Sequence, residues 1–570
     1  MSFWIKIKNG IAANLSKILN KEVFAKELVL TPNQEMGDLG WPIFALAKEL
    51  GRNPAELAKE IAKKYPTENN IKAKATGPYL NFVINKKYLA KNIIKEIEEQ
   101  KEKYGHNENL KNKKIMVEFA HPNPFKSFHI GHLRNILLGE SIVRVLEAQG
   151  AKVIRTNYQG DIGMHIAKCL WSFQKIDSKD YPTTTDLKVA LLGKCYAEGS
   201  QAFENIPEAQ AEIKEINKKI YSGEDEKIKN LWTLGKNWSL EKFHEIYQRV
   251  YSHFDCEYME SEMITDCREY IKQAEVKGIL EKSDGAIVFK GEKHGLETRV
   301  FLNSEGLPTY EGKELALAYR EFSDFGKIDL CIHNVAVEQK SFFAATFKVE
   351  ELLDEKRFKG KQYHNAYEFV GLKKGKMSSR LGNVILGNDI LNEAKENIKK
   401  IIAEKNNSLG DDKIEIIAVA AVKYAFLKIS AFKYLAFDME ESINLSGNSG
   451  PYILYTYARI QSIFKKIINH KTLIINTDFE KLSDTREFSL IKKLAIYSEI
   501  IEAATKNYDP SEIAKYIYEL AQMLNDYYHA IPILQADEET KNARLALLNS
   551  ISQVIKNGLG LLGIEVVEEM

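Results

Sequence analysis

The stretch from Lys113 to Thr156 alternates strand, helix and strand, and this alternation constrains the fold more than any other feature of the chain. Residues 115–119 form a short apolar run typical of a buried strand, residues 131–148 have the pattern of a helix, and residues 152–156 predict a second strand. Two parallel strands joined by a helix make a βαβ unit, and doubly wound sheets of this kind bind ligands beyond the carboxyl ends of their strands. We therefore expect an α/β fold with its site in the loops that follow these strands.

The loop after the first strand carries the densest group of candidate functional residues. Pro122 and Pro124 stop the strand, and His129, Gly131 and His132 open the helix. A helix N-terminus offers unpaired amide groups and a positive dipole end, which favour anionic ligands. The two imidazoles are three residues apart and share one side of the helix, and the glycine lets a flat ring approach the backbone. This combination is typical of a site for a nucleoside triphosphate.

Two other interpretations of these histidines stay open on sequence alone. They could be ordinary residues at a helix start or, with His121 and His165, ligands of a zinc ion. Zinc sites usually contain thiolates or a tight pattern of histidine and glutamate, and the chain has neither an H-E-x-x-H motif nor paired cysteines. A four-residue motif recurs by chance, so its interpretation depends on what accompanies it.

A second candidate loop runs from Gly375 to Asn383 with the sequence GKMSSRLGN. Its glycines, serines and two cations make a donor-rich segment that can fold over phosphates. It is not a G-x-x-x-x-G-K-[ST] phosphate loop, because Met377 follows the lysine. The alternative is a solvated surface loop.

Length and composition exclude several classes of protein. A chain of 570 residues is too long for one core and predicts three or more domains. The net charge of +1 gives no global field, so contact with nucleic acid requires local basic patches, for example one formed by Lys59, Lys63, Lys64, Lys72 and Lys74. The five cysteines are scattered, which predicts reduced thiols in a cytoplasmic protein and no metal site. The most apolar stretch, 414–437, is interrupted by three lysines and predicts a core helix, not a membrane span.

The pattern along the chain predicts three units. Residues 1–108 form a mixed α+β module that ends in a charged run and a turn. Residues 109–395 hold a Rossmann-type, doubly wound parallel sheet split by a mostly helical insertion at about 170–290. Residues 396–570 are almost entirely helical, which predicts an all-α C-terminal domain.

Taken together, the two loops resemble the signatures of the class I aminoacyl-tRNA synthetases. His129-Ile130-Gly131-His132 resembles the family's HIGH element, and Lys376-Met377-Ser378-Ser379 resembles its KMSK-type loop. Small nucleotidylyltransferases share the HIGH element alone. The pairing of both loops around a long insertion, with a helical tail, is typical of a synthetase.

Narrower motifs resemble the arginyl-tRNA synthetase family in particular. The segments concerned are Val117-Glu118-Phe119 with Pro122-Asn123, and Gly160-Asp161-Ile162-Gly163. Ser446 to Tyr452, with Tyr455, Ala458 and Arg459, resembles the start of the family's anticodon-binding domain. The first hundred residues resemble its N-terminal module, which contacts the tRNA elbow.

The resemblance implies an arginine–tRNA ligase. Such an enzyme activates L-arginine with ATP to arginyl-adenylate, releases pyrophosphate and transfers the arginyl group to the 3′-terminal ribose of tRNA(Arg), at the 2′-OH in this class. It implies ATP as substrate, Mg²⁺ as cofactor, and L-arginine and tRNA(Arg) as partners. It also implies a cytoplasmic monomer that binds neither DNA nor a membrane, and whose activation step commonly requires bound tRNA.

The resemblance also implies a role for individual residues. Triphosphate contacts and catalysis fall to Lys126, His129, His132 and Lys376. ATP binding falls to Phe128, Gly131, Gly160, Met377, Ser378 and Ser379. Arginine binding falls to Glu118, Asn123, Asp161, Tyr310, Glu314 and Gln339. Contacts with tRNA fall to Asn81, Tyr452, Tyr455 and Arg459, and no residue is expected to bind a metal.

Two positions depart from the family's pattern. Ser379 stands where a second lysine normally contacts the triphosphate, and Lys126, just before the HIGH element, stands where a lysine is thought to take over. A solvated loop cation is the alternative for Lys126. Glu314 stands where the family more often has aspartate, so the charge is kept but the reach differs.

The chemistry of arginine agrees with the residues expected to bind it. A guanidinium is planar, permanently charged and carries five donors, so its pocket needs carboxylates and amide oxygens. A pocket of this kind rejects lysine and citrulline because its polar groups would be left unpaired, so no editing domain is required. Simpler roles remain for some residues: Glu118 could pair with a local lysine, Tyr310 could be a core residue, Asp161 could cap a helix, and the C-terminal tyrosines could pack between helices.

Three competing functions remain at this point. A synthetase for cysteine would bring zinc ligands, which the sequence lacks. A catalytically silent tRNA-binding paralogue has no need of His129, His132 and Lys376. A small-molecule adenylyltransferase leaves the helical tail unexplained.

Overall fold

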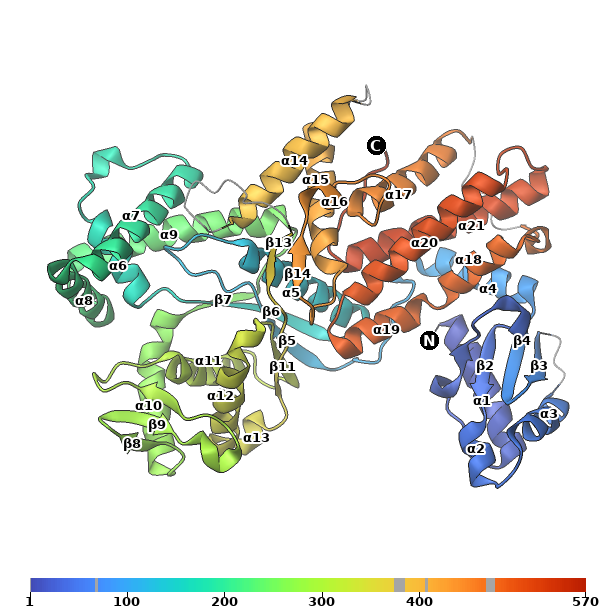
Figure 1. Cartoon of the computed structure of the whole chain (residues 1–570), viewed down its shortest axis with the longest axis horizontal. Helices are drawn as coiled ribbons and strands as arrows, with labels where there is room; N and C mark the ends of the chain where they lie inside the picture. Colours follow the sequence, from blue (N-terminus) through green and yellow to red (C-terminus); the bar gives the residue numbers. More distant parts are fainter. Residues whose placement is uncertain (1, 67–69, 374–384, 405–407, 468–476) are drawn as a thin grey trace.

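A sheet of five parallel strands lies at the centre of the molecule, which is a computed structural model describing residues 2–66, 70–373, 385–404, 408–467 and 477–570 (Figure 1). The strand order is β12-β11-β5-β6-β7. The strands are β5 (Lys114–Glu118), β6 (Lys152–Gln159), β7 (Cys256–Met259), β11 (Leu330–His333) and β12 (Gln362–His364). From β5 the chain adds β6 and β7 on one side of the sheet and then β11 and β12 on the other side of β5. The predicted doubly wound α/β core is therefore confirmed.

Alternate side chains of β5 point to opposite faces of the sheet and join separate cores. Ile115 and Val117 pack in one core with α5 (Ile130–Ala148) and the C-terminal helices. Met116 packs in a second core with α10 (Ile264–Val276), α11 (Tyr310–Asp324) and α12 (Lys340–Leu353). Because both faces are covered, the strand reads as a continuous apolar run, and this is why it was visible in the sequence.

The helical insertion is shorter than the predicted 170–290. Its helices α6 (Met164–Phe173), α7 (Thr185–Asn205), α8 (Pro207–Ser222) and α9 (Glu226–Arg249) share a core of their own. After α9 the chain returns to the central sheet as β7, which is only half-buried as an edge strand and therefore gave no clear apolar signal. β9 (Ala286–Phe289) and β10 (Arg299–Leu302) then form an antiparallel pair, with β8 (Glu281–Ser283) on the other side of β9.

The N-terminal module is an antiparallel sheet of order β1-β2-β4-β3 covered by helices. Its elements are α1 (Phe3–Leu19), β1 (Val29–Leu30), β2 (Leu39–Pro42), α2 (Phe44–Glu49), α3 (Pro54–Lys64), β3 (Ile71–Thr76), β4 (Tyr79–Ile84) and α4 (Lys86–Gln100). It lies at one end of the long axis, with α4 against the C-terminal helices, and α6 to α8 lie at the other end (Figure 1).

The C-terminal part is helical apart from short parallel strands. It comprises β13 (Val370–Leu372), α14 (Gly387–Glu404), α15 (Asp411–Leu427), β14 (Leu435–Phe437), α16 (Met439–Ser442), α17 (Gly450–Lys465), α18 (Thr485–Ala495), α19 (Tyr497–Asn507), α20 (Ser511–Ala530) and α21 (Glu538–Leu561). The short helix α13 (Glu355–Phe358) precedes β12 and packs in the second core of the sheet domain. The stretch 414–437, predicted as one core helix, divides into α15 and β14. Within the described ranges, no helix combines the length and apolarity needed to span a bilayer.

Replacing Gly139 by alanine tests the closest approach between α5 and β5. A Cβ at Gly139 would lie 2.3 Å from Cγ of Phe119, far inside van der Waals contact. We expect Gly139→Ala to lower the free energy of unfolding by about 1–3 kcal/mol, because the ring must shift in a packed core. Urea unfolding followed by circular dichroism measures the change.

The matched control is Gly10→Ala on the exposed side of α1, where an added Cβ meets nothing within 4 Å. It should raise helix stability by up to about 1 kcal/mol. Equal effects of the two substitutions would contradict the close packing of Gly139 on Phe119.

Candidate active site

A pocket of about 740 Å³ opens at the carboxyl ends of β5 and β11, where the strand order reverses. Open α/β sheets bind ligands at such a switch point. Most of the residues predicted for ATP and arginine line it: Glu118, Asn123, His129, Gly131, His132, Gly160, Tyr310, Glu314 and Gln339. Residues more than two hundred positions apart thus meet in one cavity.

The loop between β5 and α5 has a strained backbone that buried polar groups hold in place. Ala120, His121 and Phe125 have positive φ angles of 79°, 51° and 65°, which residues other than glycine rarely adopt. The Ala120 amide donates to Asn135 Oδ1 at 2.9 Å, and the Phe125 amide donates to Ser239 Oγ at 3.0 Å. Strain that the surroundings maintain in this way is typical of a pre-organised site.

The two signature histidines cap the N-terminus of α5. His129 Nδ1 accepts from the amides of Gly131 at 3.1 Å and His132 at 3.4 Å, and His132 Nδ1 accepts from the His129 amide at 3.1 Å. Because each Nδ1 accepts, each neutral ring carries its proton on Nε2. Burial lowers the pKa of His129, and it lowers that of His132 well below its usual range. The site therefore offers two uncharged N–H donors beside the helix dipole.

Asn123 connects the two loops that border these histidines. Its Oδ1 accepts from the Gly160 amide at 3.0 Å, and its carbonyl accepts from the Lys126 amide at 3.1 Å. A Cβ at Gly160 would lie 2.6 Å from Asn123 Oδ1, so a side chain there would displace the amide. Lys126 itself is half-buried, and burial lowers its pKa while the nearby carboxylate of Glu260 opposes that effect.

The other end of the pocket is built around Glu118, Glu314 and His333. Glu118 and His333 are paired residues on β5 and β11, and both are buried together with Glu314. His333 Nδ1 lies 3.3 Å from Glu118 Oε1 and 3.7 Å from Glu314 Oε1. His333 was not among the predicted site residues, although it directly follows the apolar run 330–332 and pairs with Glu118 across the two parallel strands.

Two of the predicted arginine contacts, Tyr310 and Gln339, lie at the ends of helices that face the pocket. Tyr310 is the first residue of α11 and its side chain is 65% exposed, so it is not a core tyrosine. Gln339 is the N-cap residue of α12. Glu314 lies one turn after Tyr310 on α11, so the two residues share one side of the helix.

Asp161 and Phe128 lie behind the pocket and not on its surface. Asp161 is fully buried; its Oδ1 accepts from the Ser261 amide at 2.8 Å, and its Oδ2 accepts from Lys236 Nζ at 3.2 Å. The N-cap of α6 is Gly163, so Asp161 does not cap that helix. Phe128 is buried, and its ring packs against the imidazole of His132 with the two centroids 5.3 Å apart.

The predicted triphosphate loop lies outside the described residues. Lys376, Met377, Ser378 and Ser379 fall within 374–384, so their positions are not part of the description. The residues just after this segment are placed: the Ile385 carbonyl accepts from the Ile130 amide at 2.9 Å, next to the histidine pair.

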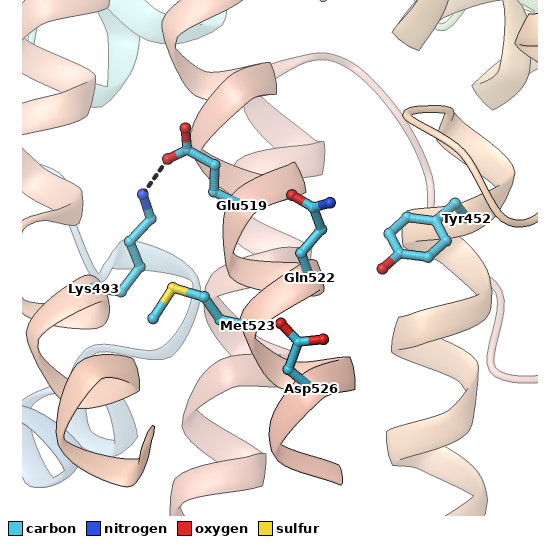
Figure 2. A pocket seen from close by; sticks show the side chains of 6 residues that line it. All are labelled: Tyr452, Lys493, Glu519, Gln522, Met523 and Asp526. Carbon is cyan, nitrogen blue, oxygen red and sulfur yellow. Dashed lines mark hydrogen bonds and ion pairs between the residues drawn. The ribbon is translucent and has the colours of Figure 1, made fainter. Parts of the chain in front are cut away.

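Three of the predicted tRNA contacts lie together on α17, against α20. Arg459 Nη1 donates to Asn525 Oδ1 at 2.8 Å, and its guanidinium lies over the rings of Tyr455 and Tyr528. Tyr452 borders an open cavity of about 420 Å³. Figure 2 shows Glu519, Gln522, Met523 and Asp526 along α20, between Lys493 and Tyr452, with Lys493 paired to Glu519.

The fourth predicted tRNA contact, Asn81, is 1% exposed on β4 of the N-terminal sheet. Its Nδ2 has no hydrogen-bond partner. The zinc interpretation finds no support in the described ranges, where no group of three or more His, Cys, Asp or Glu side chains could hold a metal ion.

Comparisons with known proteins agree with this architecture along the whole chain. Residues 93–439 match the family model for the catalytic domain of class I (R) tRNA synthetases. Residues 6–84 match the arginyl-tRNA synthetase N-terminal domain, and residues 453–570 match the DALR anticodon-binding domain. The chain is 33% identical to the arginine–tRNA ligase of Clostridium acetobutylicum, over 99% of this chain and 100% of that one.

Solved structures give the same result. The arginyl-tRNA synthetase of Thermus thermophilus superposes with a TM-score of 0.82 at 25% identity, over 100% of both chains. That of Plasmodium falciparum superposes with a TM-score of 0.79 at 20% identity, over 99% of this chain and 98% of that one, which supports the fold alone.

Proposed function

The chain belongs to the arginyl-tRNA synthetase family and is an arginine–tRNA ligase, and we propose that the pocket between β5 and β11 is where arginine is activated and transferred. The observation that carries this proposal is the opposite polarity of the two ends of one cavity. One end has the N–H donors of His129 and His132 at the start of α5, and the other has the carboxyl groups of Glu118 and Glu314. ATP and the guanidinium of arginine carry the complementary charges.

In the first step a carboxylate oxygen of arginine attacks the α-phosphorus of ATP. The bond to the bridging oxygen breaks, and pyrophosphate leaves with the bonding electron pair. The protein supplies position and charge stabilisation and no nucleophile. The histidine Nε2–H groups and the α5 N-terminus stabilise the phosphates, with Lys126 beside them and Lys376 from the segment outside the described residues. Magnesium enters with ATP as part of the substrate.

At the other end of the pocket, Glu118 and Glu314 hold the guanidinium. Asn123 and Gln339 are the amide side chains that face the rest of the amino acid. Asp161 acts indirectly, because its carboxylate already binds Ser261 and Lys236 and so fixes the loop at Gly160.

The terminal 2′-hydroxyl of tRNA(Arg) then takes the arginyl group from the adenylate. We propose that 109–395 form the catalytic unit, that 396–570 bind the anticodon through the cluster of Tyr452, Tyr455 and Arg459, and that 1–108 contact the tRNA through the surface around Asn81. The enzyme is proposed to act as a cytoplasmic monomer, in which all five cysteines are free thiols.

Amino-acid-dependent exchange of pyrophosphate into ATP across the twenty amino acids, with and without total tRNA, tests this function. We expect exchange with arginine and with none of the other nineteen amino acids. This exchange should occur only or mainly when tRNA is present. Exchange with lysine or cysteine in place of arginine would contradict the specificity. No exchange with any amino acid, in a protein that still binds tRNA, would favour a catalytically silent paralogue.

Substitution of His132 by asparagine should slow adenylate formation. The change removes the Nε2–H donor while keeping a side chain that can accept from the His129 amide. Loss of one oxyanion donor typically costs about 10²–10³-fold in turnover. We expect a fall of this order in kcat for arginine- and tRNA-dependent exchange, with KM for arginine changed less than about threefold.

The matched control for this change is His253→Asn, at an exposed histidine on a surface loop, which should leave the exchange rate unchanged. A His132 variant with normal kcat would contradict the role of the histidine pair.

Replacing Lys126 by alanine tests whether it compensates for Ser379. Lys126 is a half-buried cation on the strained loop next to the α5 N-terminus. We expect Lys126→Ala to reduce the exchange rate by about 10-fold or more, because one phosphate contact is lost. The change should affect the kinetic constants for ATP more than those for arginine. The control is Lys227→Ala on the exposed side of α9. A rate within about threefold of the parent enzyme would remove Lys126 from the triphosphate site.

A further inference from the structure

Behind the arginine end of the pocket, one imidazole lies among four buried carboxyl groups. His333 on β11 is surrounded by Glu118 on β5, Glu314 and Glu321 on α11 and Glu350 on α12. The rings of Phe343 and Phe347 lie 5.1 Å from the imidazole and close the cluster from the side of α12. Buried charges require partners of opposite sign, and one cation cannot balance four carboxylates. Some of these carboxyl groups must therefore hold protons.

The hydrogen bonds of His333 show that it is the cation. Its Nε2 lies 3.0 Å from Gln362 Oε1, and the amide orientation is fixed because Gln362 Nε2 donates to Glu350 Oε2 at 2.8 Å. Its Nδ1 faces Glu118 Oε1. Both ring nitrogens thus face acceptors, as in an imidazolium ion. Burial alone would lower the pKa of His333, but Cys331 and Glu118 raise it well above its usual range. Because burial raises the pKa of the Cys331 thiol, that group is neutral, and the effective partner is Glu118.

Burial and the neighbouring charges favour different protonation states in the four carboxyl groups. Burial acts to raise the pKa of Glu118, but the charge and the hydrogen bond of His333 outweigh it, and the pKa is lowered. Burial and the neighbouring charge of Glu118 raise the pKa of Glu314 and Glu321 well above the usual range, so both hold protons. Burial raises the pKa of Glu350 to about 7, so this carboxyl group titrates near neutral pH. In the empty cluster Glu118 is the anion that His333 balances.

Only one of the two protonated carboxyl groups, Glu314 and Glu321, borders the pocket. Glu321 lies two turns beyond Glu314 on α11, behind the pocket, where its Oε1 accepts from Thr156 Oγ1 at 3.5 Å. Glu350 is engaged with Gln362. Glu314 lines the cavity itself.

The other groups near Glu314 do not balance its charge. Glu260 is paired with Lys313. Burial keeps Tyr158 protonated by raising its pKa, and keeps His121 neutral by lowering its pKa. A charge on Glu314 therefore requires a new cation in the pocket.

From this geometry we infer that L-arginine binds by proton exchange: the guanidinium enters beside Glu118 and Glu314, Glu314 releases its proton to solvent, and His333 is the positioning residue that keeps Glu118 ionised. This inference rests on the proposed placement of arginine in this pocket. The step is balanced, since one cation enters as one proton leaves and no covalent bond between heavy atoms changes. The net charge of the cluster and its ligand is therefore the same before and after binding.

The exchange gives a defined pH dependence. Between the pKa of Glu314 in the arginine complex and its higher pKa in the empty pocket, release of one proton makes the dissociation constant for arginine fall about tenfold for each unit that the pH rises. The dependence vanishes above the pKa of free Glu314, where no proton remains to be released. ATP, at the other end of the pocket, should not show it.

Isothermal titration calorimetry of L-arginine into the full-length protein measures the proton directly. The titration is repeated at pH 7.5 in phosphate, HEPES and Tris, whose ionisation enthalpies differ, and the slope of the observed heat gives the number of protons exchanged. We expect about one proton released per arginine bound. Binding with a slope of zero in the parent enzyme would overturn the inference and leave the arginine site itself intact.

Two isosteric variants on one helix form the matched pair. Glu314→Gln should still bind arginine, at least tenfold more weakly, and release no proton. Glu321→Gln, which removes an equally buried carboxyl group that does not line the pocket, should keep the release. Release that persists in Glu314→Gln would overturn the inference. Unchanged affinity in Glu314→Gln and also in Glu118→Gln would instead overturn the proposed arginine site.

His333→Gln separates positioning from structural support. Without the imidazolium, Glu118 takes up a proton in the empty pocket, so arginine should now release more than one proton, and its KM should rise more at pH 6.5 than at pH 8.5. The KM for ATP should stay within about twofold. A purely structural defect would weaken binding equally at both pH values without raising the proton count, and that result would overturn the role of His333.

Discussion

The parallel register between β5 and β11 is the constraint on which the active site depends. It sets Glu118 opposite His333 at the carboxyl ends of two buried strands. Because the strand order reverses between these strands, the loops that follow them diverge and leave the cavity between them. A slip of one residue would turn every side chain of a strand to the other face. It would bury Glu118 in an apolar core without its cation. The fold and the charge balance of the site are therefore fixed by the same pairing.

Helix α5 links this site to the rest of the chain. Its first turn holds the histidine pair, and its middle packs Gly139 on Phe119. Farther along, buried Arg134 donates to the carbonyls of Phe369 and Lys433, and Ser141 donates to that of Leu561 at the end of α21. Carbonyl partners of this kind fix the helix at specific points on the C-terminal part. A displacement of the C-terminal helices therefore acts on the helix that carries the histidine pair.

Much of this could be predicted from local sequence, because β5 is buried on both faces and α5 begins with a capping histidine motif. The half-buried edge strand β7 was not predicted, because its residue pattern resembles that of the polar helices before it. Asp161 was expected to bind arginine or to cap a helix, and its burial under Ser261 and Lys236 could not be foreseen because Ser261 lies a hundred residues farther along the chain. His333, Glu321 and Glu350 could not be grouped, because strand pairing and the approach of two helices bring them together. Local pattern gives the elements, whereas the chemistry of the arginine end depends on contacts between them.

The division of charge within the cavity explains why the ATP end uses neutral histidines. Both substrates must lie in one space, and the guanidinium is repelled by every fixed cation there, the more strongly where water is excluded. In the proposed function, His129 and His132, whose pKa values burial lowers, donate hydrogen bonds to phosphate without adding that repulsion. The fixed cation of the other end, His333, is matched by Glu118 and so presents no net charge to arginine. Each end thus attracts its own substrate without opposing the other, and the two orient toward one another before any bond changes.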